Sequence, residues 1–202
     1  MALVLDLCRG LSLRGLNIDI GPTRSESLAA YKAVFAPGLL QLDETQDLLA
    51  TLSGPLVLGP RTNTRDANFT IRTPLGPKTE NLDVQIAMTE SLPPSDLHSI
   101  EGGGAVQRWL EHLEGGADVV WTLKDGRPLL MRDGAMHYLG GWLDAEGWGR
   151  LVDELLPNHT VLPKGLRLRT VDKHRVWINY SAHTIEHNGF KLGAADVFWE
   201  DI

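Results

Sequence analysis

The sequence is poor in cysteine, has no excess of basic residues and contains no long apolar run. A single cysteine excludes a disulfide framework and a zinc site built from several cysteines. Lysine and arginine number 19 against 26 acidic residues, so the net charge of −7 argues against a nucleic-acid partner. No apolar run approaches the roughly 20 residues that span a bilayer, and no signal peptide is recognised. We therefore expect a cytoplasmic protein with no membrane partner.

The chain nevertheless has enough apolar material for a core, since 43% of its 202 residues are hydrophobic. Residues 1–16 have helical spacing of apolar positions and a glycine stop at Gly15, although residues 2–6 could also form a strand. Strands are predicted at residues 17–20, 33–36 and 56–58, with a helix at 43–52. This alternation predicts a layered α/β domain of the flavodoxin-like type, with a mostly parallel sheet.

The remaining two thirds of the chain carry more strand signals. A long polar loop is expected at residues 61–77, and a helix at 144–156. Strands are predicted at residues 83–90, 106–113 and 119–123, of which 107–113 could also be helical, and hairpin turns at Asp125–Gly126 and Asp133–Gly134. After Pro157 only strand patterns follow, at residues 166–171, 175–180, 184–187 and 197–199. We therefore predict two domains, residues 1–160 and a small antiparallel β unit at 163–202.

Candidate catalytic residues are few. Cys8 is the only possible thiol nucleophile, but it lies in an apolar helical segment rather than in a small-residue elbow, which predicts a buried structural cysteine. No Gly-x-Ser-x-Gly elbow is present. His183 and His187 are four residues apart, but the segment has a strand pattern and does not predict a metal site.

The other residue types that could carry chemistry form no recognisable pattern. Acidic residues are abundant without an evident catalytic pair, and Gly102–Gly104 predicts a turn rather than a phosphate-binding loop. Most of the six tryptophans are expected in the core, with Trp142 a candidate rim or interface residue. We therefore assign no catalytic, cofactor-binding or metal-binding residue and expect no cofactor.

Several segments, taken in order, point to one family. They are residues 3–20 (LVLDLCRGLSLRGLNIDI), 31–37 (YKAVFAP), 56–62 (LVLGPRT), 90–94 (ESLPP) and 137–142 (HYLGGW). Together they resemble the trimerisation domain of the family 42 glycoside hydrolases, the β-galactosidases. Residues 165–169 and 176–180 resemble the small β-domain that ends those enzymes.

The resemblance implies an amidotransferase-like α/β fold that lacks the amidotransferase catalytic residues. It also implies that the chain forms a homotrimer and helps to wall active sites. Its other implied partner is a catalytic barrel, which hydrolyses terminal β-galactosides. In the family the acid/base glutamate lies in that barrel after an asparagine. No Asn-Glu pair occurs in this sequence, so no catalytic residue can be carried over.

One departure from the family pattern concerns the N-terminus. Family members have a strand before the helix that is predicted here at residues 3–16, so the chain is expected to be a fragment or a truncated product of a longer enzyme. Residues 61–77 and 109–121 are candidate trimer contacts. Two other functions stay open at this point: an amidotransferase-like enzyme using Cys8, and a carbohydrate-binding module using exposed tryptophans.

Overall fold

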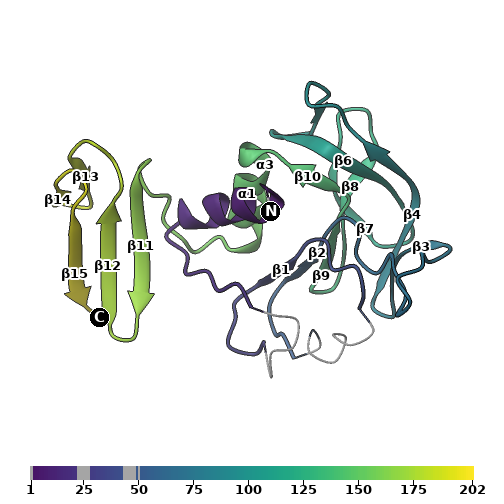
Figure 1. The fold of residues 1–202 in the computed structure, drawn as a ribbon, viewed down its shortest axis with the longest axis horizontal. Helices are drawn as coiled ribbons and strands as arrows, with labels where there is room; N and C mark the ends of the chain where they lie inside the picture. Colours follow the sequence, from purple (N-terminus) through teal and green to yellow (C-terminus); the bar gives the residue numbers. More distant parts are fainter. Residues whose placement is uncertain (1, 22–27, 43–48, 50) are drawn as a thin grey trace. The chain divides into compact units, whose positions relative to one another are not determined.

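The computed structural model describes residues 2–21, 28–42, 49 and 51–202 (Figure 1). Contacts divide the chain into two compact units. The central unit is Gly21–Arg150, and the terminal unit combines Met1–Ile20 with Leu151–Ile202. The boundary that the sequence suggests near residue 160 stays a prediction.

The first sheet of the central unit has five strands in the order β1-β2-β9-β8-β7. They are β1 (Val34–Ala36), β2 (Leu56–Leu58), β7 (Asp118–Thr122), β8 (Pro128–Asp133) and β9 (Met136–Leu139). β1 and β9 flank β2 in parallel, whereas β9, β8 and β7 pair antiparallel. The two predicted hairpins, at Asp125–Gly126 and Asp133–Gly134, are confirmed by the β7–β8 and β8–β9 pairings.

The second sheet is antiparallel throughout, in the order β10-β6-β4-β3, with β5 also paired to β6. Its strands are β3 (Leu75–Thr79), β4 (Leu82–Ser91), β5 (His98–Ser99), β6 (Ala105–Glu114) and β10 (Gly141–Leu143). On β4, the buried residues Leu82, Val84 and Ile86 alternate with exposed ones, as expected for a strand with one face in the core. Side chains from both sheets meet in one cluster: Leu56, Leu58, Leu82, Val84, Ile86, Leu113, Ala117, Met131 and Tyr138.

The prediction of a layered, flavodoxin-like α/β domain with a mostly parallel sheet, also described as amidotransferase-like, was wrong. Parallel pairing is confined, among the described residues, to β1–β2 and β2–β9, which are contacts between strands of three or four residues. The ten-residue strands β4 and β6 pair antiparallel and dominate the unit. The prediction rested on the alternating helix and strand signals of the first 60 residues. The larger part of the domain follows these residues and has the period-two pattern of antiparallel sheets. The helix predicted at residues 43–52 lies largely outside the described residues.

The terminal unit contains α1 (Ala2–Ser12), which confirms the predicted helix and not the alternative strand at residues 2–6. Gly15, with φ of 62°, follows the helix in the left-handed region that glycine adopts without cost. Residues 17–20 form no strand, contrary to prediction. Instead the Asn17 side chain donates to the carbonyl of Thr170 (2.7 Å) and accepts from its N–H (2.9 Å).

The rest of the terminal unit is β-structure after α3 (Ala145–Leu155), a helix that spans the division between the units. β11 (Leu166–Val171), β12 (His174–Asn179) and β15 (Val197–Asp201) form an antiparallel sheet, and β13 (Ile185–His187) pairs with β14 (Phe190–Leu192) (Figure 1). The four strands predicted after Pro157 are confirmed, and β14 was missed. No helix among the described residues is long and apolar enough to cross a membrane.

Candidate functional site: the basic loop after β2

The loop that follows β2 begins beside a buried carboxylate, which a different strand provides. Glu111, on β6, has no solvent exposure. Its Oε1 accepts hydrogen bonds from the Arg61 backbone N–H (2.8 Å) and from Trp109 Nε1 (3.1 Å), and its Oε2 accepts one from the Tyr138 hydroxyl (2.7 Å). Three donors from three parts of the unit therefore meet on one side chain.

The protonation chemistry of this group follows from its burial. Burial raises the pKa of Glu111 above its usual value, and the hydrogen bonds from Tyr138 and Trp109 oppose that change. Burial also raises the pKa of Tyr138 well above its usual value, and the charge of Glu111 raises it further. Because both oxygens of Glu111 are occupied by protein donors and shielded from solvent, this carboxyl serves as an anchor for the loop.

The base of the loop is fixed by its own polar side chains. Thr62 and Asn63 are buried and Thr64 nearly so. The Thr62 hydroxyl donates to the carbonyl of Gly59 (2.7 Å), and Asn63 Nδ2 donates to the carbonyl of Pro77 (2.9 Å). Asn63 (φ 53°) adopts the left-handed backbone region, which asparagine tolerates better than other non-glycine residues. The base of the loop is therefore held by side-chain hydrogen bonds to the backbone on both sides.

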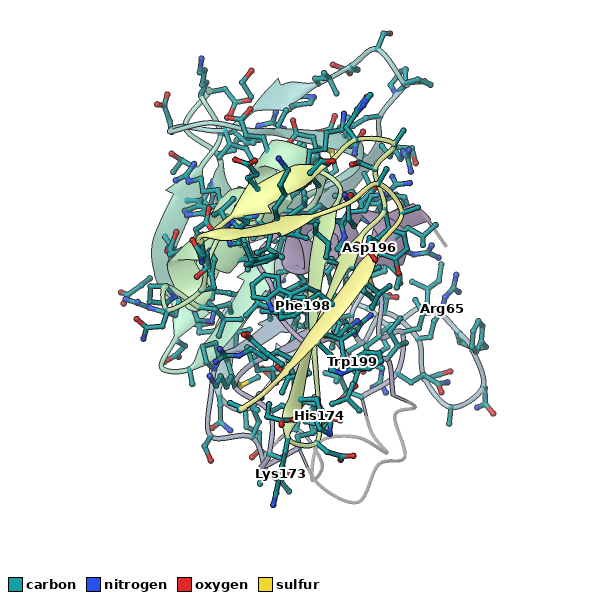
Figure 2. All side chains as sticks on the ribbon, turned by 90° about the vertical axis from the view of Figure 1, so that its left-hand side faces the viewer. Arg65, Lys173, His174, Asp196, Phe198 and Trp199 are labelled. Atoms are coloured by element: carbon teal, nitrogen blue, oxygen red, sulfur yellow. The ribbon has the colours of Figure 1, made fainter. Side chains whose placement is uncertain are left out.

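The tip of the loop is organised around Asp66. Its Oδ1 accepts from the N–H groups of Asn68 (2.9 Å) and Thr70 (2.8 Å), an Asx-type turn. Phe69 then takes a φ of 65°, and its side chain is 60% exposed. The Arg65 guanidinium lies 5.8 Å from the Phe69 ring centre and donates to the Phe69 carbonyl (3.2 Å). Figure 2 labels Arg65 on this loop. We call residues 61–72 the basic loop, because it has three arginines and one aspartate.

A second polar cluster surrounds Arg127 on the antiparallel face. Arg127 contacts Glu90 (3.0 Å), Asp125 (2.7 Å), His112 (2.9 Å) and His98 (2.9 Å). The pKa of Glu90 is lowered, first by its hydrogen bond with His112, and the pKa of Asp125 is lowered, first by that with Arg127. Between a fifth and a half of each of these side chains is exposed, so the cluster is a solvated surface network.

The residues considered from the sequence for catalysis or metal binding are not brought together. Cys8 lies on α1 and is half-buried rather than buried as expected. His187 packs against Trp177 and Phe190, with ring centroids 5.7 and 6.0 Å away, while His183 lies on an exposed turn. In the described part of the chain, no group of three histidine, cysteine or acidic residues could hold a metal ion.

Three of the six tryptophans take the core positions that were expected of most of them. Trp121, Trp148 and Trp177 are buried, whereas Trp199 is 69% exposed. Trp142 is half-buried on β10, and among the described residues its Nε1 has no hydrogen-bond partner. Sequence reasoning missed Glu111, although a carboxylate inside the predicted strand at residues 106–113, which is rich in apolar residues, is a signal that could have been used.

Comparison with known proteins shows which family the chain belongs to. Residues 2–162 match the family described as the β-galactosidase trimerisation domain. A curated β-galactosidase from Thermus thermophilus is 32% identical, over 85% of this chain and 28% of the relative. The solved β-galactosidase of the psychrophilic Marinomonas ef1 has a TM-score of 0.90 at 25% identity, covering 96% of this chain and 32% of that one.

A β-galactosidase from the haloarchaeon Halorubrum lacusprofundi shares the fold, with a TM-score of 0.85 at 24% identity over 99% of this chain and 35% of that one. The chain thus spans about a third of the length of these relatives. The resemblance found in the sequence is confirmed: this chain belongs to the β-galactosidase trimerisation domain family.

Proposed function

We propose that the chain is the non-catalytic assembly region of a β-galactosidase and forms a homotrimer. The observation that carries the proposal is the family match over residues 2–162, within relatives about three times as long. On this proposal, terminal β-galactosides are hydrolysed in a catalytic barrel with which the chain associates. A cytoplasmic location and a division into residues 1–160 and 163–202 stay predictions from the sequence.

The surroundings of Glu111 and Cys8 do not suit the catalytic chemistry that a glycosidase or an amidotransferase-like enzyme requires. The buried carboxyl of Glu111 is enclosed by protein donors, and a glycosidase needs two carboxyls that reach the substrate. Nothing in the described part of the chain favours an amidotransferase-like enzyme, because Cys8 lies within a helix instead of at a strand-to-helix turn.

The test is the solution mass of the 202-residue chain, measured by size exclusion with light scattering over a wide range of concentrations. We expect a species of three times the chain mass of 22.2 kDa. A monomer at every concentration would contradict the proposal. A second measurement addresses catalysis: the chain alone should not hydrolyse a nitrophenyl β-galactoside, and steady turnover by the purified chain would show that it is catalytic.

A further inference from the structure

The basic loop differs in charge from the rest of the molecule. Its three arginines and one aspartate give a formal charge of +2, and because the whole chain carries −7, the remaining residues carry −9. The loop is therefore a positively charged segment on an acidic chain, and its electrostatic complement is an acidic protein surface.

The tip of this loop presents apolar side chains to solvent. Phe69 is 60% exposed, and Ile71, which lies two residues further on and forms an isolated bridge with Arg65, is 56% exposed. Aromatic residues and arginine are both enriched where proteins contact one another. Here the Arg65 guanidinium lies over the Phe69 ring, so charge and apolar area are presented together.

The backbone holds this arrangement at a conformational cost. A φ of 65° is rare for a bulky aromatic residue and is a strained backbone conformation. The turn persists because Asp66 accepts two backbone N–H groups and donates its own N–H to the Thr70 carbonyl (3.0 Å), while Gln41 Nε2 donates to the Asp66 carbonyl (2.5 Å). A preorganised tip loses little conformational freedom when it binds.

We propose that the basic loop is one half of the contact between copies of this chain, and that it packs Phe69 and Ile71 against an acidic surface of the neighbouring copy. The inference rests on the proposed function, since it assigns a surface to that assembly. A cyclic trimer uses heterologous contacts, in which two different patches meet. A loop of charge +2 on a chain of charge −7 suits that geometry, because a self-facing contact would oppose the arginines of two loops.

The decisive variant is Phe69→Gly. Glycine adopts a φ of 65° freely, so the backbone of the isolated chain is relieved while the aromatic contact is removed. We expect the midpoint concentration for trimer dissociation to rise at least about tenfold, with an unfolding temperature of the monomer that is unchanged or higher. Leu97→Ser, which alters another exposed apolar residue (55%) of the same unit and lies outside both candidate contact segments, should leave the midpoint within about twofold.

A charge reversal tests the electrostatic part. Arg65→Glu should weaken the trimer and remove its sensitivity to added sodium chloride, whereas Arg132→Glu changes the net charge equally and should not. If the unaltered chain is a trimer and both loop variants keep its dissociation midpoint, the inference is overturned and the proposed function stands. If the unaltered chain is a monomer throughout, the proposed function fails, and the inference fails with it.

Discussion

The two units each fix a loop with one buried polar side chain, but the chemistry of that side chain differs. In the central unit it is Glu111, an ionisable group with three donors. In the terminal unit it is Asn179, 1% exposed, whose Nδ2 donates to the carbonyls of His183 (2.8 Å) and Gly193 (2.6 Å) and whose Oδ1 accepts from the Ser181 N–H (2.8 Å). One anchor titrates and the other does not.

The apolar cores of the two units differ as well. The central unit has a cluster of nine buried residues from both of its sheets, whereas the terminal unit has a cluster of four: Leu162, Leu166, Trp177 and Leu192. Figure 2 shows Phe198 and Trp199 on β15, and both are exposed, at 43% and 69%. A small core tolerates a neutral amide, which is cheaper to bury than a charge. The comparison predicts that substitution of Glu111 lowers the free energy of unfolding more than substitution of Asn179. It also predicts that the loss at Glu111 depends on pH.

Glu111→Ala is expected to have the largest effect. Removing the carboxylate leaves the Tyr138 hydroxyl, the Trp109 indole N–H and the Arg61 N–H without their acceptor, and it opens a cavity. A loss of about 3–5 kcal/mol in the free energy of unfolding is expected. Urea denaturation measures it. Glu114→Ala, an exposed position on the same strand, serves as the control and should change stability by less than about 0.5 kcal/mol.

Asn179→Ala should have the next largest effect and should act locally. The variant removes the hydrogen bonds of Asn179 to two carbonyls and one N–H, at a cost of about 1–3 kcal/mol. Hydrogen exchange should show faster exchange in β11, β12 and β15, with unchanged protection in β4 and β6. Asn158→Ala, an exposed asparagine, is the matched control. Equal loss of protection in both units would contradict the separation of the two anchors.

Local patterns in the sequence predicted many of the strands and turns in both units. The sequence predicted a strand at residues 83–90, where β4 lies, and hairpins at the two Asp-Gly turns, because strand preference and turn chemistry are local properties. Strand partners are not local. The three-residue strands β1 and β2 suggested parallel layers, and nothing within them indicated that β9 would continue into an antiparallel hairpin pair.

The anchors and the basic loop likewise depend on contacts between residues far apart in the sequence, which local patterns do not predict. Asp66 could have been predicted to cap a turn, since aspartate commonly accepts backbone N–H groups two residues on. The exposed, left-handed Phe69 depends on contacts from Gln41 and Arg65, which no local pattern encodes. Glu111 and Asn179 are recognised as anchors only when their partners, distant in the chain, are placed.

The two anchors, Glu111 and Asn179, should also differ in how their contribution to the free energy of unfolding depends on pH. Burial raises the folded-state pKa of Glu111, so its stabilising contribution is full below the unfolded pKa and is lost as the pH rises through the folded pKa. A tenfold difference in proton affinity between the folded and unfolded chains corresponds to about 1.4 kcal/mol of stability. Glu111→Gln should remove this dependence, so unaltered protein and variant should differ in slope from about pH 4 upward. The cost of Asn179→Ala should stay constant across the same range.

The smallest effect is expected at Glu90, a carboxylate of the same antiparallel sheet that faces solvent. Its side chain is 34% exposed, and its pKa is lowered, first by the hydrogen bond with His112. Its contribution is therefore present above the unfolded pKa and is lost as the pH falls through the folded pKa, opposite in sign to that of Glu111. Glu90→Gln should cost less than about 1 kcal/mol, and added salt should reduce the cost further. A larger cost, insensitive to salt, would show that Glu90 behaves as a third anchor and that burial does not decide which carboxylates fix this fold.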